Sequence, residues 1–151
     1  LTQSQIAMFS LVGAIGAVAA PISGRLADAG HTRRASQLAM VLGVVSFLPA
    51  FINPFYGVIG LAVTGVALDF AVQMNMVLGQ RAVYALGTAN RGRLNALYMI
   101  SIFIGGAIGS SVASSLYEHA SWLAVAAVGS ALSLVALVAF SMVSRRAGQA
   151  Q

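Results

Sequence analysis

Three polar side chains in one long apolar stretch are the residues of this sequence best placed to do chemistry. Asp69, Gln73 and Gln80 fall within roughly 40° of one another on one helix face, at about 100° per residue. A carboxylate beside carboxamides can exchange a proton and bind a polar solute. The stripe therefore predicts a solute or proton pathway, with a structural hydrogen bond or ion pair between helices as the alternative. Asn75 falls on a different face and is expected to make a packing contact.

Few other residues of the sequence are suited to catalysis. The chain has no Cys and no Lys, which excludes thiolate metal sites, a phosphate-binding loop lysine and Schiff bases. Asp69 has no second carboxylate in an apolar stretch, and His31 and His119 fall in loops on opposite sides. We therefore expect no enzyme, no cofactor and no metal site.

The composition predicts a membrane environment. Of the 151 residues, 59% are hydrophobic and 7% are charged, whereas soluble domains carry about 25% charged residues. Crossing a bilayer takes about 20 mostly apolar residues. Helices are predicted at residues 6–22, 35–52, 55–79, 94–116 and 122–143. The last is apolar all round, unlike a helix of a soluble bundle. The fold class expected is an all-α integral membrane protein, with five transmembrane helices in a single membrane domain over residues 1–151.

The arginines predict the orientation of the chain. Among eight arginines, three acidic residues and two histidines, only Asp69 falls inside a predicted span. Every arginine falls on one side of the predicted membrane: Arg25, Arg33, Arg34, Arg81, Arg91, Arg93, Arg145 and Arg146. Short cytoplasmic loops carry an excess of basic residues. We therefore expect an inner (plasma) membrane protein with a cytoplasmic carboxy terminus, and no nucleic-acid partner despite the net charge of +5.

Small residues recur at helical spacing in the fourth predicted span. Gly105, Gly109 and Ala113 are each four residues apart. Small residues let helix backbones approach closely in lipid. They predict a helix-packing seam, serving either static packing or a sliding contact used in gating.

The first polar loop has a pattern of its own. Gly24 and Asp28 bracket the segment Gly-Arg-Leu-Ala-Asp, and the pair Arg33 and Arg34 follows. This loop resembles the one that joins the second and third helices, and in a weaker copy the eighth and ninth, of major facilitator superfamily transporters. Ala29 replaces the usual basic residue and the second glycine comes one position early, which favours the weaker copy.

A later stretch is similar to the same family. Residues 80–106 look like the end of the tenth helix, the following loop and the eleventh helix in a bacterial efflux-like branch, in which Asn often stands where this chain has Gly79. The resemblance covers nearly the whole chain as helices eight to twelve. In the family, the eighth, tenth and eleventh helices line the central cavity, while the ninth and twelfth lie outside.

What the resemblance implies is alternating access, in which two six-helix halves rock about a midplane site. Gly24, Asp28, Arg33 and Arg34 would form a cytoplasmic gating loop. In it, the Asp28 carboxylate would pair with Arg33 or Arg34, or cap a helix, and so latch the outward-open state.

The function expected is part of a secondary active transporter of small molecules, a proton-coupled exporter. Five spans are fewer than the six of one half, so we expect a carboxy-terminal fragment. Its partners would be the lipid bilayer, a small-molecule solute, protons and the missing amino-terminal half. The alternative is a small integral-membrane interaction or assembly protein that binds partner helices and moves nothing.

Overall fold

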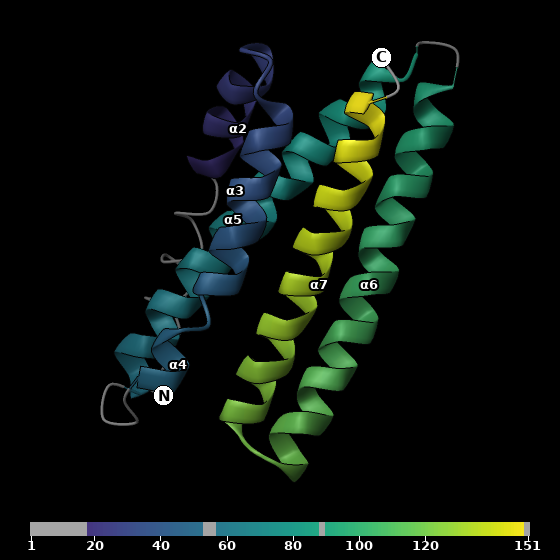
Figure 1. Cartoon of the computed structure of the whole chain (residues 1–151). Helices are drawn as coiled ribbons and strands as arrows, with labels where there is room; N and C mark the ends of the chain where they lie inside the picture. The colour runs from purple at the N-terminus through teal and green to yellow at the C-terminus, as the bar shows by residue number, and fades with distance from the viewer. Residues whose placement is uncertain (1–17, 53–56, 88–89, 150–151) are drawn as a thin grey trace.

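The computed structural model describes residues 18–52, 57–87 and 90–149, and this part of the chain is helical with short connections (Figure 1). Successive long helices run in opposite directions, so the arginine-bearing ends gather at one end of the bundle. The helices are α2 (Ala19–Asp28), α3 (Thr32–Val45), α4 (Pro49–Ile52), α5 (Gly57–Ala85), α6 (Arg91–His119) and α7 (Trp122–Gln149).

Four helical stretches are long and apolar enough to cross a membrane. They are Thr32–Phe51, Ile59–Ala85, Arg91–His119 and Trp122–Arg145. The all-α membrane fold class is thus confirmed. Several helix ends extend beyond the predicted apolar segments: α3 begins at Thr32, α5 ends at Ala85, α6 runs from Arg91 to His119 and α7 ends at Gln149. The predicted span 6–22 lies mostly outside the described residues, and α2 continues past its predicted end to Asp28.

The predicted helix 35–52 is interrupted. A turn at residues 46–48 separates α3 from α4, and the Ser46 hydroxyl donates to the carbonyl oxygen of Gly43 at 2.7 Å. Pro49, which lacks an N–H, begins α4, a position where that donor is not needed. The turn buries Phe47 against α7, where a Cβ on Gly129 would lie 2.6 Å from the Phe47 ring.

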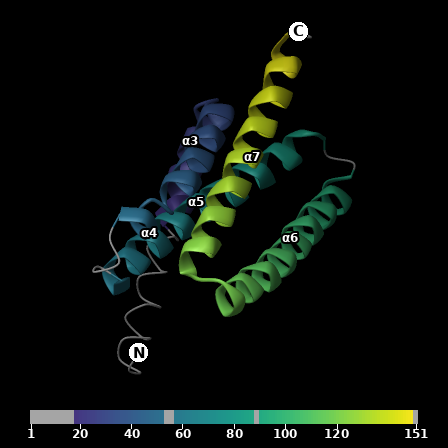
Figure 2. The same ribbon diagram turned by 60° about the horizontal axis from the view of Figure 1, so that its bottom comes forward.

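The packed core lies among α2, α3 and α5. Ala19, Ala35, Ala39, Met74 and Leu78 form one buried cluster. Three of the five are alanines, which let the helix backbones approach closely. In both views α7 lies between α3 and α6 (Figures 1 and 2), and α6 has no buried residue. Among the described helices, α5 is therefore packed closely against α2 and α3, whereas α6 lies at the edge of the bundle.

Candidate functional site

An ion pair joins α2 to α5 at the arginine-rich end. Nη1 of Arg81 donates to Oδ1 of Asp28. Gly24, one turn before Asp28, makes room for the cation, since a Cβ there would lie 3.2 Å from Nη2 of Arg81. Gly24 thus leaves the space in which the Asp28 carboxylate of α2 binds an arginine of α5.

This pairing differs from the one expected from the sequence. Arg33 and Arg34 lie exposed on the first turn of α3, and the carboxylate of Asp28 meets Arg81 instead. The cause is tertiary, because α2 packs against α5 and brings Arg81 beside the end of α2. The alternative expected for Asp28, capping a helix, is not seen at α3. The N-cap residue of α3 is His31, and no side chain makes a capping hydrogen bond there. Gly24 and Asp28 themselves belong to α2 rather than to a loop.

The predicted polar stripe divides along α5. Gln80 donates from Nε2 to Oδ1 of Asn95 on α6 at 3.2 Å, and to the Tyr84 hydroxyl at 3.4 Å. Asp69 and Gln73 are half-buried, and the side-chain hydrogen bonds found among the described residues do not include them. Gln80 thus ties two helices together, while Asp69 and Gln73 lie in the middle of α5.

A tyrosine supplies a polar contact between α5 and α6. The Tyr98 hydroxyl donates to the carbonyl oxygen of Met76 at 3.0 Å. It approaches so closely because residue 79 is glycine, where a Cβ would lie 2.9 Å from Cζ of Tyr98. The sequence drew attention to Gly79 as a departure from Asn, and the structure shows that the glycine admits a ring from the neighbouring helix.

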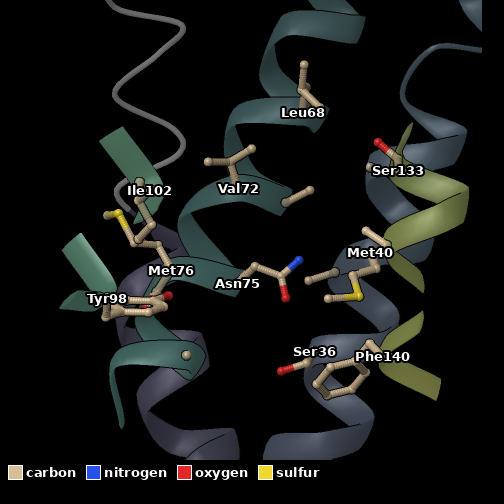
Figure 3. Close-up of a pocket in the computed structure, with 15 residues that line it drawn as sticks. Ser36, Met40, Leu68, Val72, Asn75, Met76, Tyr98, Ile102, Ser133 and Phe140 are labelled. Atoms are coloured by element: carbon tan, nitrogen blue, oxygen red, sulfur yellow. The ribbon is translucent and has the colours of Figure 1, made fainter. Parts of the chain in front are cut away.

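A cavity of about 470 Å³ opens between α3, α5, α6 and α7 (Figure 3). Its polar groups are Ser36, Asn75, Tyr98 and Ser133, one from each helix. The expected packing contact at Asn75 is in fact a wall of this cavity. Helical periodicity could not find the site, because it depends on how four helices meet.

The predicted glycine seam on α6 is not closely approached by the other described helices at its two glycines. A Cβ on Gly105 or Gly109 would have no described atom within 4 Å. Ala113 is half-buried on the same helix. Packing through the seam stays a prediction. Within the described ranges, no group of three His, Asp or Glu side chains is placed to hold a metal ion.

Long apolar helices, arginines gathered at one end and a carboxylate midway along a spanning helix define a multi-pass α-helical membrane protein. The family model of the Major Facilitator Superfamily matches residues 1–150. The chain belongs to the major facilitator superfamily, as the loop around Asp28 suggested, and therefore to a family of transporters rather than enzymes.

Two curated relatives are similar over much of the chain. The uncharacterized transporter YgaY of Escherichia coli strain K12 and that of E. coli O157:H7 are each 33% identical over 116 residues. The match covers 77% of this chain and 29% of each relative, so the chain spans less than a third of their length. No solved structure matches the chain.

Proposed function

We propose that this chain forms helices eight to twelve of a secondary active transporter that exports small organic molecules in exchange for protons. Membership of a transporter family favours this over an assembly protein. The observation that carries proton coupling is the position of Asp69, half-buried in the middle of α5. A charged side chain at that depth costs about 2.5–3.5 kcal/mol on insertion scales, and this cost supports a functional role for the carboxylate.

The proposed pathway follows α5. Asp69 lies twelve residues after Gly57 and sixteen before Ala85, roughly 18 Å from the helix start at helical rise. Gln73 follows one turn later on the same face. In this scheme Asp69 carries the proton and Gln73 binds the solute. The helix corresponds to the tenth helix of the family, which lines the central cavity.

The ion pair of Asp28 with Arg81 is proposed as the cytoplasmic gate of alternating access. Both side chains are exposed to solvent, Asp28 at 69% and Arg81 at 44%. Exposed pairs contribute only about 0–1 kcal/mol to stability, which suits a contact that breaks in each cycle better than a permanent brace. It shifts the conformational equilibrium only by the difference in its energy between the two states. The arginine-rich end would face the cytoplasm of the inner membrane.

Proton coupling is tested with the full-length protein in vesicles under an imposed pH gradient. Asp69→Asn should abolish proton-driven solute movement, because the amide cannot bind and release a proton. Glu118→Gln, at the opposite end of the bundle, is the matched control and should leave coupling intact. Proton-driven transport at the normal rate in Asp69→Asn would show that the carboxylate is structural.

The gate is tested by charge changes at its two members. Asp28→Asn and Arg81→Gln should each lower turnover more than solute affinity, and exchanging the two charges in one variant should restore part of the rate. Arg145→Gln, an exposed arginine at the same end, serves as the control. Unchanged turnover in both single variants would contradict the gate.

A further inference from the structure

The cavity between α3, α5, α6 and α7 is lined by residues that are not part of the proposed transport pathway. Its volume of about 470 Å³ lies within the range of about 300–1,000 Å³ typical of small-molecule sites. Asp69 and Gln73 do not line it. By the family resemblance, α3 and α7 are the ninth and twelfth helices, outside the central cavity. Two of the four walls of the pocket therefore come from helices outside the central cavity, and the pocket does not include the residues proposed for transport.

The walls of the cavity are mostly apolar and carry no charged side chain. The large apolar lining residues are Met40, Leu68, Val72, Met76, Ile102 and Phe140. Two of them are methionines, whose flexible thioethers adapt to irregular shapes and make favourable contacts with aromatic rings. An ion would find no opposite charge here, so the walls favour an uncharged occupant.

Asn75 supplies a hydrogen-bonding group to this apolar space. Figure 3 shows its amide extending from α5 toward Met40, with Ser36 and Phe140 nearby. The amide offers two donors and one acceptor, and the hydrogen bonds formed among the described residues do not include it. An amide in an apolar interior gains more from a partner than one in water.

We propose that this cavity binds an uncharged, mostly apolar small molecule carrying one N–H, hydroxyl or amide group, with Asn75 as the hydrogen-bond partner of that group. Met40, Met76 and Phe140 contact its apolar body. The site requires neither Asp69 nor the gate. Failure of the proton-coupling test would therefore leave it standing, and failure of the binding test would leave the transport proposal standing.

The test uses two probes of the same bicyclic shape, indole and indene, of which only indole has an N–H. The full-length protein, labelled with ¹³C-methyl methionine, is placed in nanodiscs and titrated with each probe. Indole should shift the methyl signals of Met40 and Met76 in a saturable way. Met40→Leu and Met76→Leu assign the two signals.

Three variants locate the binding. Asn75→Leu should raise the Kd of indole about two- to tenfold, the value of one neutral hydrogen bond, and leave that of indene unchanged. Ala136→Phe, which fills the cavity from α7, should abolish saturable binding of both probes. Ala131→Phe, at another exposed alanine of α7 that lies outside the lining, is its matched control and should change the binding of neither probe.

Two results would overturn the proposal. Shifts that rise linearly with both probes and survive Ala136→Phe would show partition into the bilayer, and no site. Saturable binding of both probes that is insensitive to Asn75→Leu would show a pocket for plain hydrocarbon, such as a lipid tail, and would remove the role of Asn75.

Discussion

The α2–α3–α5 cluster and α6 carry similar patterns of small residues, yet only the cluster buries them. Ala19, Ala35 and Ala39 are at most 2% exposed, and they pack between neighbouring helices. On α6, a side chain added to Gly105 or Gly109 would meet no described atom within 4 Å. A stripe of small residues therefore shows where a helix can be approached closely, and says nothing of which helix approaches it.

The two regions are also joined to α5 in different ways. The helices α2 and α3 meet α5 through a buried cluster that includes Leu78 and Met74. By contrast, hydrogen bonds link α6 to α5 near the start of α6, from Tyr98 to Met76 and from Gln80 to Asn95. Apolar packing therefore holds α2 and α3 against α5, whereas hydrogen bonds near one end of α6 hold it against α5.

The largest effect on stability is expected at the centre of the packed region. Leu78→Ala should lower the free energy of unfolding by about 2–5 kcal/mol, because Leu78 is fully buried and leaves a cavity. Leu132→Ala, at a residue of α7 that is 61% exposed, is the control, and a change within about 0.5 kcal/mol is expected. Unfolding of the purified full-length protein in detergent measures both. Equal losses of unfolding free energy in the two variants would show that the packed and exposed regions do not differ in their contribution to stability.

The tie between α5 and α6 is tested at its closest approach. Gly79→Ala should cost about 1–3 kcal/mol of unfolding free energy, because the added methyl overlaps the Tyr98 ring. Gly65→Ala on the same helix, with no described atom within 4 Å, should be neutral or slightly stabilising. In a double-mutant cycle with Tyr98→Leu, the loss at residue 79 should shrink. Additive losses would show that the two residues do not interact.

The open seam of α6 is expected to matter when the rest of the transporter is present. Gly109→Leu should destabilise the full-length protein by about 1–2 kcal/mol, within the cost of about 1–3 kcal/mol for adding bulk to a close contact. Ser114→Leu, exposed on another face of α6, is the matched control. If the two variants unfold alike in the same assay, the seam faces lipid, and no helix packs against it in the full-length protein.

The smallest effect on stability is expected at the ion pair that closes the packed region. Asp28→Asn should change the unfolding free energy by less than about 1 kcal/mol, because both partners are exposed to solvent. Raising the salt concentration from 0.1 M to about 1 M should shrink the difference further. If Asp28→Asn lowers the unfolding free energy by much more than about 1 kcal/mol, the ion pair is a permanent structural contact, and this would contradict its role as a gate.

The membrane fold could be predicted because helix length and apolar composition are local properties. The break at residues 46–48 had a local signal in Pro49, but the continuous apolar stretch concealed it. The gathering of arginines at one end also followed from counting spans. Arg25, Arg81 and Arg145 lie near the carboxy-terminal ends of α2, α5 and α7, and Figure 1 shows these helix ends at the same end of the bundle.

The partners of individual side chains could not be predicted, because they depend on which helices pack together. Asp28 meets Arg81, fifty-three residues away, rather than its sequence neighbours. Asn75 faces a cavity whose four walls come from four helices. Gly79 gave a usable signal, since a glycine within an apolar helix often marks a close approach by another group.

All eight strongly basic side chains of this chain are arginines, and none is lysine. This choice decides how the arginine-rich end responds to pH and to reagents that modify amines. A guanidinium keeps its proton throughout the physiological pH range, so the contribution of the arginines to the charge of this end does not change with pH. Acetylation and amine-reactive reagents find no lysine side chain to modify. Any pH dependence that these 151 residues contribute must therefore arise chiefly from three carboxyl side chains and two imidazoles.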